Sequence, residues 1–391
     1  MRTAGIIAAA VLLLCGGVSW GGEISPLRFA PVEMTVEDPS PVEMTVEREA
    51  PSPVISSEGR QAEVEKSPEE EETLDMEEYL FGHISDAYEW HILTFKGREA
   101  AIPLPCIVLD GGLKVFSSER LAHGAEYAGL RIAAKGESHE GKIVRASDGT
   151  RPLDISITKN VLGLMIDSLL LVVLVLLCAR WYRRHDALKE APTGLAGLME
   201  PLIVMVEQDV IKDAVGPEYR KYSPYLLTAF FFILINNLMG IVPFFPGGAN
   251  ITGNIAVTLT LALFTFAMVN LFGNKHYWKE ILWPDVPIFL KAIPIMPIIE
   301  IVGMFTKPFS LMIRLFANML AGHIMLLSTI ALVFLTAKMG PVLNGSLSFV
   351  AVLFGIFLDC LELLVAFIQA YVFTMLSSVF IGLAHQQPET H

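Results

Sequence analysis

Long apolar runs fill the C-terminal part of this chain, whereas the N-terminal part is polar and is broken by proline and glycine. Five runs are candidates to cross a membrane: residues 161–179, 225–245, 254–273, 297–337 and 347–384. A bilayer core about 30 Å thick needs about 20 apolar residues in a helix. The last two runs are about twice that length, so we expect these helices to tilt strongly or to lie partly along the interface.

Basic residues beside the runs predict their orientation. Arg180, Arg183 and Arg184 directly follow the first run, and two lysines follow the third. Because lysine and arginine gather on the cytoplasmic side, these ends are expected in the cytoplasm, with the N-terminal region outside and the C-terminus inside. Between the first two runs, residues 194–215 carry charges at helical spacing among apolar residues. We expect an amphipathic helix there, on the cytoplasmic surface.

The chain before the first run divides into three segments. Residues 1–22 have a basic start, a short apolar core and small residues, which is typical of a secretory signal peptide. Residues 23–73 are acidic and proline-rich and contain PVEMTVE twice, which indicates a disordered linker. Residues 74–160 alternate over short stretches and predict a small β-rich domain, exported to the periplasm. Residues 161–391 form the membrane domain, so the expected fold class is an all-α multi-pass membrane protein with this small added domain.

Composition supports a membrane protein. The chain is 53% hydrophobic and 18% charged, which is too apolar for one soluble domain. The net charge of −13 comes largely from the acidic N-terminal stretch, and no basic patch with interleaved aromatics predicts nucleic-acid binding. The four cysteines have no CxxC or Cys/His spacing, so we predict no disulfide framework, no metal site and no cofactor.

Polar residues inside the last two runs carry the candidate chemistry. Arg314 lies within the fourth run, where a charge costs about 2.5–3.5 kcal/mol even on a lenient insertion scale. Arginine cannot lose its proton to avoid that cost, so the charge needs a partner. A charged partner inside a membrane indicates an ion pathway. Ser310 and Asn318 share its helix face at i±4 spacing. His323 lies about 180° around the helix from Arg314, facing a different neighbour.

Antiparallel packing of the last two runs predicts two levels of paired polar residues. Arg314 is expected level with Gln369, and His323 level with Glu362, with Asp359 close to the face of Glu362. Histidine titrates near neutral pH and a carboxylate tunes it, so the outer pair suits a proton relay. The alternative is purely structural, because polar side chains also hold membrane helices together. In the first run, Asp167 is expected near the outer interface.

Three stretches resemble one known family. Residues 307–323, KPFSLMIRLFANMLAGH, closely resemble the signature of subunit a of F-type ATP synthases. Residues 237–243, NLMGIVP, and residues 362–373 of the last run do so as well. The resemblance covers most of residues 194–384 and implies a non-catalytic, proton-translocating stator subunit in the bacterial inner membrane. Ala317 stands where many members of the family have glycine.

The resemblance also implies roles and partners. In that family the arginine faces a ring of c subunits, separates two offset half-channels and helps each c-subunit carboxylate to release its proton; this role falls on Arg314. Other polar positions of the family correspond to Ser310, Asn318 and Gln369 near the arginine, and to His323 and Glu362 in the outer channel. The implied partners are the c ring, peripheral-stalk b subunits, the soluble ATPase sector and membrane lipid.

Two other function classes stay open. A free-standing proton-coupled transporter needs a substrate cavity, often marked by inverted repeats with broken helices, and the sequence shows no such symmetry. An intramembrane metalloprotease needs a pairing such as HExxH, which the runs lack. The sequence does not distinguish protons from sodium, does not give the ring size and assigns no role to the exported domain.

Overall fold

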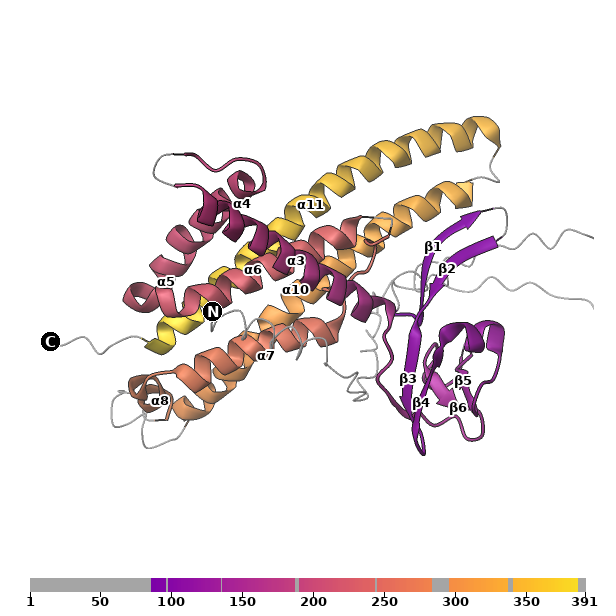
Figure 1. Ribbon diagram of the computed structural model, residues 1–391, viewed down its shortest axis with the longest axis horizontal. Coiled ribbons are helices and arrows are strands. Elements are labelled where there is room, and N and C mark those ends of the chain that lie inside the picture. The colour runs from indigo at the N-terminus through magenta and orange to yellow at the C-terminus, as the bar shows by residue number, and fades with distance from the viewer. Residues whose placement is uncertain are drawn as a thin grey trace, which may run out of the picture. The chain divides into compact units, whose positions relative to one another are not determined.

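The computed structural model describes most of the chain after the predicted linker. The described residues are 86–95, 98–134, 136–186, 190–242, 245–282, 295–336 and 340–385. They form a small β region followed by a helical body (Figure 1). The predicted signal peptide at 1–22 and linker at 23–73 lie outside the described residues.

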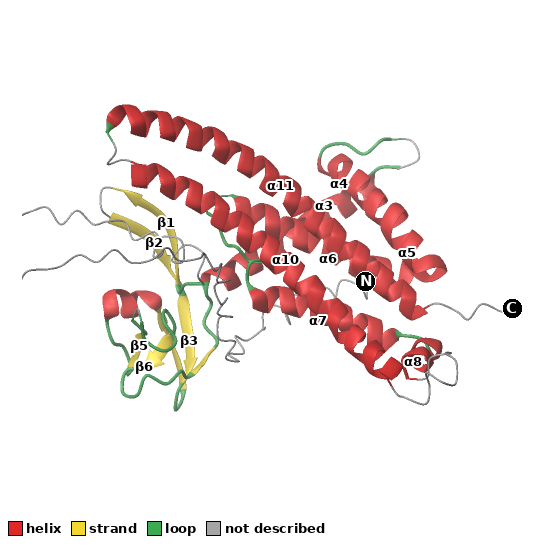
Figure 2. Ribbon diagram, turned by 180° about the vertical axis from the view of Figure 1, so that it is seen from behind, coloured by secondary structure: helices red, strands yellow, loops and turns green. Residues whose placement is uncertain are grey.

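Short antiparallel strands form the β region, as the alternating stretches predicted (Figure 2). The strands are β1 (Glu89–Phe95), β2 (Arg98–Pro103), β3 (Pro105–Leu109), β4 (Leu113–Ser117), β5 (Leu130–Ile132), β6 (Ile143–Arg145) and β7 (Leu153–Asp154). They pair as β1–β2, β4–β3–β7 and β5–β6, with the 3₁₀ helix η1 (Ser118–Gly124) after β4. Cys106 and Val108 alternate inward from β3 and form a core with Phe116 and Leu121.

A buried hydrogen-bonded pair closes this core. The hydroxyl of Tyr88 donates to the carboxylate of Asp154, which also accepts the backbone N–H of Ser156 at 2.9 Å. Burial raises the pKa of Tyr88, with the Asp154 charge as a further cause, so the phenol stays protonated and keeps donating. Burial also raises the pKa of Cys106 to about 11, which makes its thiol unreactive.

Five helical stretches are long and apolar enough to cross a membrane, as predicted: Lys159–Arg184, Leu195–Ile241, Ile255–Phe272, Ile298–Val333 and Val342–His385. They belong to α3 (Lys159–Arg184), α6 (Tyr219–Ile241) with its preceding turns, α7 (Ile255–Phe272), α10 (Ile295–Leu335) and α11 (Pro341–His385). The short helix α8 (Lys275–Leu282) follows α7. Orientation and tilt in a membrane stay predictions.

Two helix boundaries differ from the sequence prediction. Helix α6 ends at Ile241 rather than at 245, because Val242 precedes Pro243 and the residue before a proline avoids helical geometry. Helix α11 begins at Pro341 rather than at 347, since proline fits the first turn of a helix, where no backbone N–H is needed. Hydropathy alone marked only the most apolar part of each helix.

The predicted amphipathic segment is a series of short helices that runs directly into α6. It comprises α4 (Leu195–Val204), the π-helix η2 (Met205–Lys212), α5 (Asp213–Val215) and the 3₁₀ turn η3 (Gly216–Glu218). Val206 and Val210 are buried while Asp209 and Asp213 are exposed, so the segment is amphipathic. Its apolar face packs against α6 and α11 rather than standing free.

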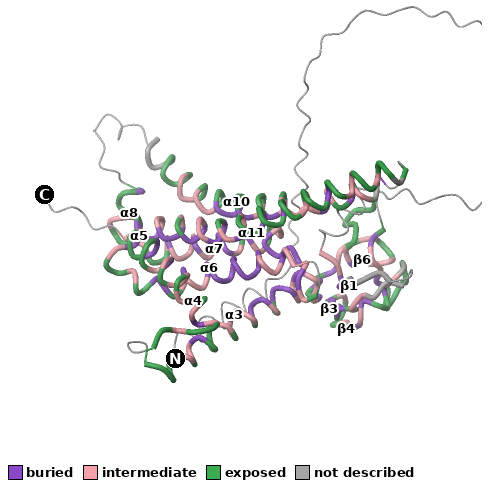
Figure 3. The backbone as a smooth tube through the Cα atoms, turned by 90° about the horizontal axis from the view of Figure 1, so that it is seen from above, coloured by how far each residue is buried: buried purple, intermediate pink, exposed green. Residues whose placement is uncertain are grey.

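Helix α6 lies at the centre of the helical body, with α3 and α11 packed against it. Its side chains Tyr222, Leu226, Phe230 and Ile233 are at most 1% exposed. Helices α10 and α11 form an antiparallel hairpin, and α7 packs against α10. Many residues along α10 and α11 are exposed (Figure 3). A large share of them are apolar, among them Phe305, Phe309, Leu353 and Phe357. Such a surface is typical of contact with lipid or with a partner protein.

Candidate functional site

The α10–α11 hairpin brings the predicted polar residues to two levels. Gly322 marks a close approach, because a Cβ built there lies 3.3 Å from Oε1 of Glu362 and 3.6 Å from its carboxyl carbon. His323 directly follows Gly322, so it shares the level of Glu362. In an antiparallel hairpin, eight residues back from Gly322 to Arg314 correspond to eight forward from Glu362 to residue 370. Arg314 therefore lies about level with Gln369, which directly precedes residue 370.

The polar residues of α10 that flank Arg314 lie on the exposed face of this helix, away from the helical body. Ser310, Arg314 and Asn318 are all exposed, whereas Leu311 and Leu315 are buried against the helical body. Spacing of i, i+4 puts the three polar side chains on one face of the helix, as predicted. Among the described residues, no carboxylate forms an ion pair with Arg314. The guanidinium is therefore available to a group from outside this chain.

The polar residues of α11 are mostly inside. Glu362 and Gln369 are each 7% exposed, so their side chains face the other helices and not the open side. Asp359 is exposed and lies one turn before the buried Glu362. His323 on α10 is half-buried beside Gly322. The hairpin thus combines an exposed positive charge with a buried row of polar groups.

Asn237 of the NLMGIVP stretch fastens α6 to the polar part of α11. Its side-chain nitrogen donates to the backbone oxygen of Ala366 at 3.2 Å, and its side-chain oxygen accepts the hydroxyl of Thr252 at 2.7 Å. Ala366 lies between Glu362 and Gln369 on α11. Both ends of the buried amide are satisfied, so Asn237 fixes α11 at the level where the buried polar residues lie.

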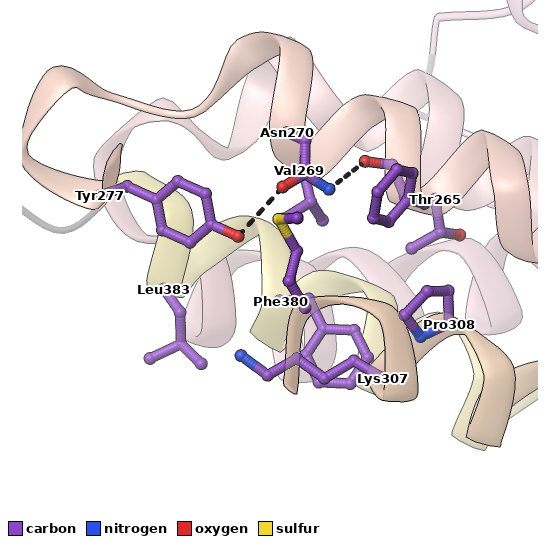
Figure 4. Close-up of a pocket in the computed structure, with 10 residues that line it drawn as sticks. Thr265, Val269, Asn270, Tyr277, Lys307, Pro308, Phe380 and Leu383 are labelled. Atoms are coloured by element: carbon purple, nitrogen blue, oxygen red, sulfur yellow. Dashed lines mark hydrogen bonds between the residues drawn. The ribbon is translucent and has the colours of Figure 1, made fainter. Parts of the chain in front are cut away.

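A pocket near the other end of the hairpin was not predicted from the sequence (Figure 4). It is formed by α7, α8, α10 and α11, and the hydroxyl of Tyr277 donates to Asn270 at 3.2 Å within it. Burial raises the pKa of Tyr277, so it stays a neutral donor. Lys307 lies 6.0 Å from the centre of the Phe380 ring.

Lys307 also lines an adjoining groove with Arg314. The groove is lined by Thr306, Lys307, Ser310, Leu311, Arg314, Leu376 and Phe380. Lys307 and Arg314 are seven residues, about two helical turns, apart, so they lie on the same side of α10. The sequence analysis did not single out Lys307, although its seven-residue spacing from Arg314 could have indicated that the two side chains share a face. Within the described residues, no three His, Cys, Asp or Glu side chains are grouped to hold a metal.

Asp167 and its neighbours form a second polar site that the sequence did not identify. We expected Asp167 near the outer interface, but the structure buries its side chain to 2% exposure against the helical body. Sequence position gives the depth of a residue along a helix and does not show which face is covered. Ser168 is buried beside it at 3% exposure.

Comparisons with known proteins cover the helical body and the β region separately. A family model described as "ATP synthase A chain" matches residues 165–382. A model described as "Domain of unknown function (DUF8433)" matches residues 79–161. These two matches meet at the start of α3, where the sequence also changes from polar to apolar.

Several curated proteins are similar over most of the chain. ATP synthase subunit a of Pelodictyon phaeoclathratiforme is 43% identical over 290 residues, which covers 69% of this chain and 80% of that protein. ATP synthase subunit a 2 of Prosthecochloris aestuarii is 44% identical over 284 residues, covering 70% and 81%. The corresponding subunit of Myxococcus xanthus is 40% identical over 253 residues, covering 63% and 78%. The resemblance predicted from residues 307–323 is thereby confirmed, and the chain belongs to the ATP synthase A chain family.

Proposed function

We propose that this chain is the proton-channel stator subunit of a rotary F-type ATP synthase and is itself not catalytic. The observation that carries the proposal is the position of Arg314. It is exposed on α10, it is level with the buried Gln369, and it lies inside a helix otherwise apolar enough to span a membrane. An arginine kept in that place needs a negatively charged partner from outside the chain.

A ring of c subunits, each with a membrane carboxylate, is the proposed partner of this face. A fixed guanidinium stabilises the ionised form of a carboxylate that arrives opposite it, which helps that carboxylate to release its proton. The same charge repels a proton that would otherwise pass straight through. Each proton that crosses 100 mV releases about 2.3 kcal/mol, and a barrier of this kind directs that energy into rotation.

The two half-channels are proposed on opposite sides of Arg314. His323 and Glu362 form the outer route, because they lie at one level and Glu362 is buried with its carboxylate against Gly322. Asp359, exposed on α11, lies one turn from Glu362 at the outer part of this route. The groove that contains Lys307, Ser310 and Arg314 is the proposed inner route, with Asn318 and Gln369 flanking the arginine.

The same proposal places the chain in the bacterial inner membrane. The basic end of α3, Arg183 and Arg184, and Lys279 in α8 are proposed to lie in the cytoplasm with the C-terminus. The β region then lies in the periplasm, after a cleaved signal peptide and a linker. Peripheral-stalk b subunits and the soluble ATPase sector complete the proposed set of partners.

ATP-driven proton pumping tests this proposal. Inverted membrane vesicles with Arg314→Ala are expected to lose pumping by at least about 100-fold, because the charge that separates the half-channels is gone. Arg180→Ala removes an exposed arginine at the end of α3 and is the matched control, which should pump normally. Assembly is checked on native gels. Normal pumping by an assembled Arg314→Ala complex would contradict the proposal and favour a free-standing transporter.

A further inference from the structure

The sheet β4–β3–β7 has an apolar outer face as well as an apolar inner one. Cys106, Val108 and Phe116 point into the core of the β region, so the residues that alternate with them point the other way. When one face of an antiparallel sheet covers a core, the other face is normally polar. Here the other face carries six aliphatic side chains: Ile107, Leu109, Leu113, Val115, Leu153 and Ile155. Five of the six are between 47% and 66% exposed.

These six side chains form two rows across the three strands. In one row, Leu109 on β3 pairs with Leu113 on β4 and with Leu153 on β7. The second row, two residues nearer the start of β3, consists of Val115, Ile107 and Ile155. Paired residues of neighbouring strands lie about 5 Å apart, so the six side chains are contiguous. We call them the outer apolar face.

The outer apolar face is continuous with the membrane-spanning helix α3. After β7 the chain keeps pairing with β3, because the backbone N–H of Ile157 donates to the backbone oxygen of Pro105 at 3.1 Å. Two residues later Lys159 begins α3, and its backbone N–H donates to the backbone oxygen of Ala87 at 2.9 Å. The apolar run of α3 begins at Val161. The face therefore starts close to the level at which α3 enters the membrane.

The length of β3 limits how this face can be oriented. Five residues of strand span about 17 Å, whereas the headgroup layer on each side of a bilayer core is about 5–8 Å thick. A sheet that stood upright on the membrane would hold the row of Leu109 in water, where exposed apolar surface is unfavourable. A sheet that lies along the membrane surface places both rows against lipid.

The size of the face and the charge beside it favour lipid over a second protein. Five aliphatic side chains, each roughly half exposed, amount to on the order of 500 Å². A stable protein pair buries about 800 Å² per partner. Asp110, in the turn between β3 and β4, is paired with Lys114 at 2.9 Å and with Arg145 at 2.7 Å. Its negative charge is thus balanced, whereas a free carboxylate would repel lipid phosphates.

We propose that the outer apolar face rests on the phospholipid bilayer beside α3 and holds the β region along the membrane surface. The inference goes beyond the proposed function, because it depends on α3 crossing a membrane and not on proton conduction. It gives the β region a defined attachment: the sheet is fixed at one edge by the chain entering α3 and on its outer face by lipid.

Photochemical cross-linking tests which molecule covers the face. The photoreactive residue p-benzoylphenylalanine replaces Leu113 or, as the control, Glu119, which is exposed on η1 at the core side of the sheet. Each assembled complex is placed in phospholipid vesicles and irradiated, and the adducts are identified by mass spectrometry. We expect at least about fivefold more phospholipid adduct at position 113 than at position 119. Equal lipid yields, or adducts from 113 mainly with a second copy of this chain or with another subunit, would overturn the proposal.

A second measurement does not depend on a photochemical yield. A nitroxide is attached to Leu113→Cys or Glu119→Cys in the same complex, with Cys15 and Cys360 replaced by serine; the other two natural cysteines are buried. Oxygen, which enters lipid, and a nickel chelate, which stays in water, then compete to relax the label. We expect oxygen to dominate at position 113 and nickel to dominate at position 119. Dominance of nickel at both positions would overturn the proposal, whatever the proton-pumping activity of the complex.

Discussion

Helices α10 and α11 are the two halves of one hairpin, yet their polar residues differ in exposure. On α10, Ser310, Arg314 and Asn318 are exposed among apolar neighbours such as Phe309 and Ile313. On α11, Glu362 and Gln369 are buried against the rest of the body. An exposed polar face on a membrane helix needs a partner, whereas a buried one either holds helices together or, as we propose here, provides an internal path.

The difference suits the two groups to the different roles that we propose for them. The charge on α10 is permanent and exposed, so we propose that it acts on a partner carboxylate that moves past it. The carboxylate of Glu362 on α11 lies against Gly322, and we propose that it exchanges protons with His323 at the same level. Asn237 holds α11 from the other side, so the buried row keeps its level relative to α10.

The largest expected effect on the buried side comes from Glu362→Gln. Glutamine keeps the size and the hydrogen bonding but cannot carry a proton, so ATP-driven pumping should fall at least about tenfold in vesicles with normal assembly. Asp359→Asn makes the same chemical change on the exposed side of α11 and should reduce pumping much less. Equal losses in the two variants would show that burial does not separate their roles.

A smaller effect is expected from Gly322→Ala. The added methyl group would lie 3.3 Å from Oε1 of Glu362 and would force the carboxyl group to shift. We expect pumping to fall about two- to threefold, as for other small displacements of a positioned group. Gly303→Ala in the same helix is the matched control, because its Cβ position has no neighbour within 4 Å. A similar loss in both variants would indicate a general effect on α10.

The sequence predicted the parts of this account that depend on local spacing. The i, i+4 pattern placed Ser310, Arg314 and Asn318 on one face, and hydropathy predicted five membrane-spanning helices. It did not predict the burial of Asp167 or the contact between Gly322 and Glu362. Both depend on which helices pack together, and residues far apart in the chain decide that.

The β region shows the same division between local and long-range information. Alternating apolar residues predicted strands around Cys106 and Val108. The pairing of β3 with β7 joins Val108 to Asp154, and the placement of Trp90 joins the domain to the loop before α7. Neither contact can be predicted from the local alternation of apolar and polar residues.

Cysteine cross-linking to the ring tests most directly whether the polar face of α10 is a partner surface. Asn318→Cys and Leu315→Cys are compared in a background with the four natural cysteines replaced by serine, and each is oxidised beside a cysteine placed next to the ring carboxylate. We predict a cross-link from position 318, which is exposed, and none from position 315, which is buried. A cross-link from 315 alone, or none from 318 in an assembled complex, would contradict the account.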